Sequence, residues 1–115
     1  LMERITETCA EYLKAQVVAG ADAVQIFDSW GGLFSLRDWQ RLVRPHIEAL
    51  LAETSTMGVP RIFYLQGAAH LLDAVLELPA AAFSLDWCVD LPALRARAVS
   101  AAPPGNPARD CPTSR

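Results

Sequence analysis

The sequence lacks a surplus of positive charge, and it lacks any long apolar run. Its 115 residues hold 10 Lys and Arg residues against 13 Asp and Glu residues, for a formal net charge of −3. This balance provides no basic surface for nucleic acid or an anionic membrane, so we expect neither partner. No apolar run reaches the roughly 20 residues that span a bilayer. Glu3, Arg4 and Glu7 argue against a signal peptide.

Familiar catalytic motifs are also missing. The sequence has no phosphate-binding loop, Cys-X-X-Cys pair, Gly-X-Ser-X-Gly elbow or His-Glu-X-X-His run. Cys9, Cys88 and Cys111 are odd in number and widely spaced, which predicts neither a disulfide framework nor a zinc site. We expect two buried or half-buried thiols and one tail thiol in a reducing cytoplasm. A cofactor-free reaction or a binding role remains.

The composition is that of a folded chain, with 52% hydrophobic and 20% charged residues. The length suits one small domain, whereas a full (β/α)8 barrel takes about 250 residues. Leu1 is not a natural start and Met2 follows it, so we expect a fragment or a partial gene product.

Helical and strand patterns alternate along the chain. Helices are predicted over residues 1–19, 36–53, 68–78 and 91–98, and strands from Ala23 and over 61–65 and 82–87. Pro45 predicts a kink or restart near Val43–Arg44. Alternation of this kind indicates a parallel sheet with right-handed crossovers. An open doubly wound sheet and a barrel segment both fit the pattern.

Apolar stripes predict which helix side chains are buried. The residues expected to be buried are Ile5, Cys9, Tyr12, Leu13, Gln16, Val17, Leu36, Trp39, Leu42, Val43, Ile47, Leu50 and Leu51. Two groups of basic residues are instead expected on solvated faces: Arg37, Arg41 and Arg44, and Arg95 and Arg97.

The first strand carries the most informative pattern. Strand alternation places Gln25, Phe27 and Ser29 on one face, while the other face is aliphatic until Asp28. A polar and aromatic face at a strand's carboxyl end is typical of a ligand pocket in parallel α/β proteins. The Gly31-Gly32 pair that follows allows a turn and a close approach.

The block Gly20–Gly32 resembles the centre of the uroporphyrinogen decarboxylase family. Gly58-Val59-Pro60 before one strand and Ser84-Leu85-Asp86-Trp87 at the end of another agree in order and type. The resemblance covers roughly residues 1–99 and only the middle-to-late portion of the family's chain. It implies a partial (β/α)8 TIM-barrel segment of about three parallel strands with flanking helices, and it favours the barrel over the doubly wound sheet.

The resemblance implies a reaction in haem and porphyrin biosynthesis. Members of the family remove carbon dioxide from the four acetate side chains of uroporphyrinogen to give coproporphyrinogen, without a metal or organic cofactor. They are cytoplasmic and usually homodimeric. Protonation of a pyrrole carbon creates the electron sink, so an enzyme must hold several carboxylates and stabilise a pyrrole cation with an anionic partner.

Two residues match the family's pocket positions. The resemblance assigns Ser29 to a hydrogen bond with a substrate carboxylate and Phe27 to the tetrapyrrole pocket wall. A turn-capping hydroxyl and plain barrel core are the alternatives for these residues. The family's essential aspartate, its N-terminal arginines, its pocket tyrosine and its C-terminal histidine match no residue here. We therefore expect no catalytic residue and no turnover by this chain alone.

Other polar residues are expected to be structural. Asp28 is predicted to orient a backbone group or pair with a basic residue, Asp86 to make a loop hydrogen bond, and His70 to be structural or solvated. Two further function classes stay open: a non-catalytic degenerate fragment, and a corrinoid-dependent methyltransferase of the same barrel superfamily. The latter usually brings zinc held by His and Cys, and no such pattern is present.

Residues 100–115 differ from the rest of the chain. Four prolines and almost no apolar periodicity predict an irregular or disordered tail. The family continues here with a strand ending in Gly-Asn-Leu-Asp-Pro, where this chain has Gly105-Asn106-Pro107. We hypothesise that the reading frame shifts, or the domain breaks off, around Ser100.

Overall fold

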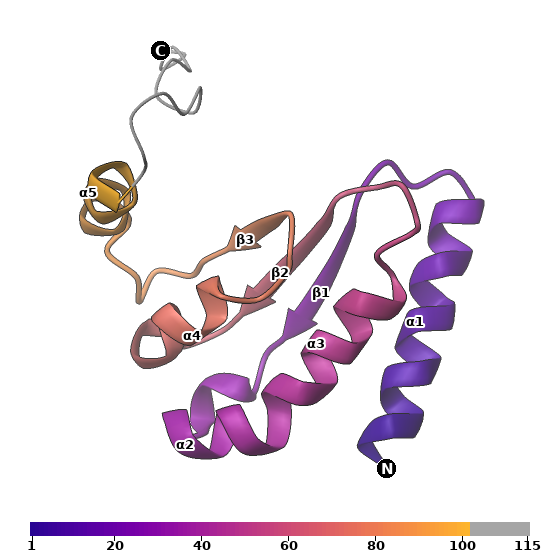
Figure 1. The fold of residues 1–115 in the computed structure, drawn as a ribbon, viewed down its shortest axis with the longest axis horizontal. Helices are drawn as coiled ribbons and strands as arrows, with labels where there is room; N and C mark the ends of the chain where they lie inside the picture. The colour runs from indigo at the N-terminus through magenta and orange to yellow at the C-terminus, as the bar shows by residue number, and fades with distance from the viewer. Residues whose placement is uncertain (102–115) are drawn as a thin grey trace.

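Three parallel strands form one open sheet in the computed structural model, which describes residues 1–101 (Figure 1). The strands are β1 (Val24–Asp28), β2 (Arg61–Leu65) and β3 (Ala82–Ser84), paired in the order β1-β2-β3. The strands follow one another in sequence order, and within residues 1–101 the face opposite the hydrophobic core is left open, whereas a doubly wound sheet is covered by helices on both faces. The predicted partial barrel segment is confirmed as the fold class.

Helical segments precede, connect and follow the strands. The α-helices are α1 (Met2–Val18), α2 (Leu36–Asp38), α3 (Arg44–Glu53), α4 (Leu72–Leu76) and α5 (Leu91–Ala101). The remaining turns are η1 (Gly31–Leu33), the π-helical η2 (Trp39–Val43) and η3 (Ala69–Leu71). Within residues 1–101, none of these helices has the length and apolar character to cross a membrane.

The helix predicted over residues 36–53 is interrupted at its centre. Its π-helical part ends where the Arg44 N–H donates to the carbonyl of Trp39, five residues back. The helix then restarts as α3, with Pro45 in its first turn. Proline lacks an N–H and is tolerated there because the first turn has no intrahelical acceptor for it. The predicted restart near Val43–Arg44 is confirmed.

One face of the sheet carries the hydrophobic core. Val24 and Ile26 of β1 and Phe63 and Leu65 of β2 are buried against the helices. The opposite face, here called the open face, holds residues that are exposed or half-buried: Gln25, Phe27, Ile62, Tyr64, Ala82 and Ser84. The strands thus alternate between a helix-covered side and an accessible side.

The predicted helix stripes are only partly correct. Trp39, Val43, Leu50 and Leu51 are buried, as is Leu13. The prediction of burial was wrong for five residues that are exposed: Ile5, Cys9, Tyr12, Leu36 and Leu42. Helices α1 and α3 pack side by side (Figure 1), yet a groove of about 650 Å³ that both helices line remains open. Ile5, Cys9 and Leu42 face this groove, so their apolar surfaces find no partner within residues 1–101.

The predicted boundary between the segment 1–99 and the tail 100–115 falls near the end of the described residues. Helix α5 was predicted to end at Ala98 and continues to Ala101. The rest of the predicted tail, together with Cys111, lies outside the described residues.

Candidate functional site

Asp28 ends β1, and Ser29 begins the loop that follows. The Asp28 carboxylate accepts hydrogen bonds from the N–H groups of Trp30 (3.2 Å) and Gly31 (2.7 Å). Asp28 therefore orients backbone groups of the turn, as predicted. Ser29 is the residue between Asp28 and Trp30, and it is exposed.

The loops after β1 and β2 are in direct contact. A Cβ atom at Gly32 would lie only 2.1 Å from the carbonyl oxygen of Gln66, so no side chain fits at that position. Gly67 has a φ of +67°, a conformation that glycine adopts without strain. The Gln66 N–H also donates to the Asp28 carbonyl at 3.0 Å. The Gly31-Gly32 pair thus permits the close approach that the sequence indicated.

Asp86 links the segment after β3 to the loop after β2. Its carboxylate accepts the N–H of Gly67 at 2.7 Å and the N–H of Cys88 at 3.1 Å. The predicted loop hydrogen bond is confirmed. Strand β3 ends at Ser84, so the prediction that it reaches Trp87 was wrong. Trp87 is 91% exposed.

His70 joins the loops from the other side. Its Nε2–H donates to the carbonyl of Phe34 at 2.8 Å, which ties the segment after β2 to the segment after β1. His70 is exposed and makes this contact, which agrees with the prediction that it is structural or solvated. Within residues 1–101, no group of three or more His, Cys, Asp or Glu side chains is arranged to hold a metal ion.

Two aromatic rings meet on the open face above these loops. Phe27 and Tyr64 are register partners on β1 and β2, and their ring centroids lie 5.7 Å apart in an edge-to-face arrangement with an interplanar angle of 63°. Phe27 is 67% exposed, and Tyr64 is half-buried. Sequence reasoning missed Tyr64. Period-2 alternation within Arg61–Leu65 could have placed it on the face of Phe27, once the register of the two strands was known.

The carboxyl end of β1 therefore combines apolar and polar groups that are accessible to a ligand. Phe27 supplies an accessible ring, and Ser29 supplies a hydroxyl two residues further along the chain. The nearby carboxylates of Asp28 and Asp86 already accept backbone N–H groups. The described part of the site thus provides an accessible ring and a hydroxyl, and its two carboxylates help to shape the loops.

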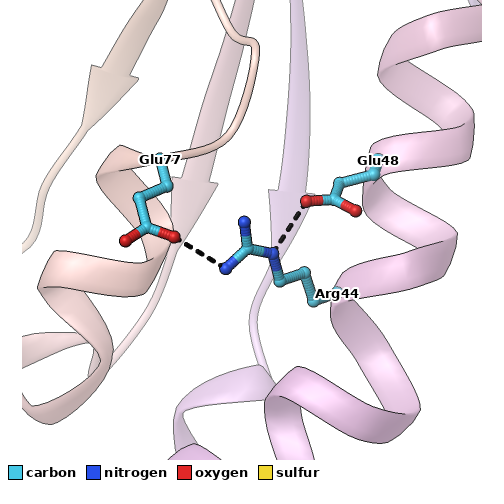
Figure 2. A network of polar contacts seen from close by, with 3 residues as sticks. All are labelled: Arg44, Glu48 and Glu77. Atoms are coloured by element: carbon cyan, nitrogen blue, oxygen red, sulfur yellow. Dashed lines mark hydrogen bonds and ion pairs between the residues drawn. The ribbon is translucent and has the colours of Figure 1, made fainter.

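Arg44 has a structural role outside this site (Figure 2). Its Nε donates to Glu48 at 2.7 Å, and its Nη1 donates to Glu77, just after α4, at 2.9 Å. Hydrogen bonds raise the pKa of Arg44, and the bond to Glu48 has a larger effect than the bond to Glu77. The prediction that Arg44 lies on a solvated face was wrong, because its side chain is 23% exposed and bridges two helical segments.

The two cysteines within the described residues are exposed, so their predicted burial was wrong. Cys9 faces the open groove beside α1. Cys88 follows the turn that Asp86 organises, and desolvation together with the Asp86 carboxylate raises the pKa of its thiol. Cys9 is accessible because the groove beside α1 is unfilled, and Cys88 is accessible because it lies at a turn.

Together, the strand order, the helix-covered face and the carboxyl-end loops define a segment of a parallel α/β barrel. Residues 1–106 match the family described as "Uroporphyrinogen decarboxylase (URO-D)", and the chain belongs to this family.

Curated relatives agree with this assignment. The chain is 44% identical over 106 residues to the "Uroporphyrinogen decarboxylase" of Bacillus thuringiensis (strain Al Hakam) and to that of Bacillus cereus (strain AH187). It is 43% identical to the protein of the same name from Bacillus anthracis. Each alignment covers 92% of this chain and 30% of the relative. The chain thus spans less than a third of the length of these relatives.

Proposed function

We propose that this chain forms one wall of a uroporphyrinogen-binding site. Phe27 contacts the tetrapyrrole ring system, and the Ser29 hydroxyl donates a hydrogen bond to a carboxylate of the substrate. The observation that carries the proposal is the exposure of the Phe27 ring on the open face, next to Ser29 at the carboxyl end of β1. The names of the relatives support uroporphyrinogen as the ligand.

The chemistry of the ligand fits this wall. A tetrapyrrole has a large apolar surface, which an accessible aromatic ring can cover, and ionised side chains at its periphery. A hydroxyl that donates to a carboxylate makes a charge-assisted hydrogen bond, which is shorter and stronger than a neutral one. Phe27 therefore contributes mainly contact area, whereas Ser29 contributes orientation.

The 115 residues alone bind the ligand without decarboxylating it under this proposal. Decarboxylation requires proton transfer to a pyrrole carbon and an anion near the resulting cation. The Asp28 and Asp86 carboxylates accept backbone N–H groups that shape the loops, and the family's essential aspartate matches no residue of this chain. We further propose the family's cytoplasmic location, its independence from cofactors and its homodimeric assembly for a complete protein that contains this segment.

The test combines an activity assay with ligand binding. Purified chain is incubated anaerobically with uroporphyrinogen and assayed for coproporphyrinogen, and uroporphyrin binding is followed by fluorescence. We expect no product, and measurable binding that Phe27→Ala weakens about 10-fold and Ser29→Ala about 3-fold. Leu33→Ala is the control, since Leu33 is 80% exposed and lies outside the open face.

Two results would contradict the proposal. Product formation by the unmodified chain would show that the residues for proton transfer are present after all. Absence of binding by a chain that circular dichroism shows to be folded would contradict the proposed binding role of this segment.

A further inference from the structure

A row of side chains crosses all three strands of the open face. The strand register pairs Phe27 with Tyr64, and Tyr64 with Ser84. Register partners in a parallel sheet point to the same face, so the row consists of a phenyl ring, a phenol and a hydroxyl. Ser29 follows Phe27 by two residues, beyond the end of β1. Hydroxyl groups thus lie near Phe27 at two separate places: Tyr64 is beside it on the neighbouring strand, and Ser29 is two residues further along the chain.

Tyr64 is the amphipathic member of this row. The edge-to-face contact with Phe27, at 5.7 Å between ring centroids, holds the Tyr64 ring against the apolar wall. None of the side-chain hydrogen bonds within residues 1–101 uses the hydroxyl of Tyr64 or Ser84. Tyrosine usually places its ring on apolar surface and its O–H on a polar partner.

We infer that Tyr64, assisted by Ser84, is a specificity-determining residue that hydrogen-bonds an acetate carboxylate of the tetrapyrrole. The inference rests on the proposed function. Ser29 holds one peripheral carboxylate, and the Tyr64 hydroxyl holds another on the neighbouring strand, while Phe27 contacts the ring system between them. A wall with two such points distinguishes ligands by their number of carboxylates, because a donor without its partner loses the interaction.

The comparison of uroporphyrin with coproporphyrin tests this inference. Coproporphyrin has methyl groups where uroporphyrin has acetate side chains, so it offers fewer carboxylates on the same macrocycle. We expect Tyr64→Phe to weaken uroporphyrin binding by about 3- to 10-fold and to change coproporphyrin binding by less than about 2-fold. Ser84→Ala should act in the same direction with a smaller effect. Tyr64→Ala, which also removes the ring, should weaken both ligands.

The chain provides its own matched control. Tyr12 lies on α1, is 64% exposed and is remote from the open face. Tyr12→Phe removes the same hydroxyl group and should leave both affinities unchanged. Tyr64→Phe retains the ring, and a thermal unfolding curve that matches the unmodified chain would establish that any change in affinity reflects the hydroxyl.

The outcomes separate this inference from the proposed function. Loss of affinity in Phe27→Ala with unchanged affinity in Tyr64→Phe would overturn the role of Tyr64 and leave the wall in place. Equal weakening of both ligands by Tyr64→Phe would refute discrimination by carboxylate number. Failure of the unmodified chain to bind either ligand would overturn both proposals.

Discussion

A missing side chain at position 32 decides how two loops of the site meet. The loop after β1 lies against the carbonyl groups of Gln66 and Gly67, at a separation that leaves no space for a methyl group. Asp86 holds the other side of this contact through the Gly67 N–H. The position of Ser29 therefore depends on residues that follow both other strands.

We predict that Gly32→Ala destabilises the chain by about 1–3 kcal/mol, because the clash is with rigid backbone atoms and forces the loop to shift. The measurement is the free energy of unfolding from urea titration followed by circular dichroism. Ser55→Ala in the exposed loop after α3 is the control and should change stability by less than about 0.5 kcal/mol. Equal stability of the two variants would show that the loops are not in contact.

At the scale of elements, Arg44 joins α3 to the segment after α4. It is the first residue of α3 and reaches Glu77 from a segment 33 positions further along the chain. Both partners are partly exposed, with Glu48 at 43% and Glu77 at 64%. Solvent screens such pairs, so the bridge stabilises the packing of these elements only modestly.

A double-mutant cycle with Arg44→Ala and Glu77→Ala measures this bridge. We predict a coupling free energy of about 0.5–1 kcal/mol at low ionic strength, with a smaller value in 1 M salt. The pair Arg97–Asp73 is the comparison, since its side chains are 63% and 77% exposed and its coupling should be close to zero. A coupling for Arg44–Glu77 no greater than for Arg97–Asp73 would contradict the bridging role.

At the scale of the whole molecule, residues 1–101 expose surfaces that isolated domains usually cover. Strands β1 and β3 each have one edge without a strand partner among the described residues. The open face carries Phe27, and the groove beside α1 is lined mainly by apolar side chains. Unpaired edges and accessible apolar patches favour association between chains.

We predict concentration-dependent self-association of the 115-residue chain in sedimentation velocity experiments. Phe27→Lys should reduce it, because a charge on the open face opposes stacking of two sheets. Leu33→Lys adds the same charge at a position outside this face and should reduce association less. A chain that stays monomeric at all concentrations would contradict the prediction that the unpaired edges and apolar surfaces drive association.

Local patterns in the sequence were sufficient for the order of elements. The prediction of a strand at Arg61–Leu65 was confirmed with both bounds, and Pro45 located the helix restart at Arg44. Alternation in β1 also separated the buried Val24 and Ile26 from the accessible Phe27. These features follow from side-chain periodicity and the missing N–H of proline, which act over a few residues.

Tertiary structure alone decided how distant segments use their side chains. The role of Asp86 depends on its bonds to Gly67 and Cys88, and the role of Arg44 depends on Glu77. The place of Tyr64 beside Phe27 required the register between two strands. The sequence by itself determined the repeating β/α units, because each is specified by its own period. Contacts between units depend on which residues meet in space, and periodicity along the chain carries no information about those pairs.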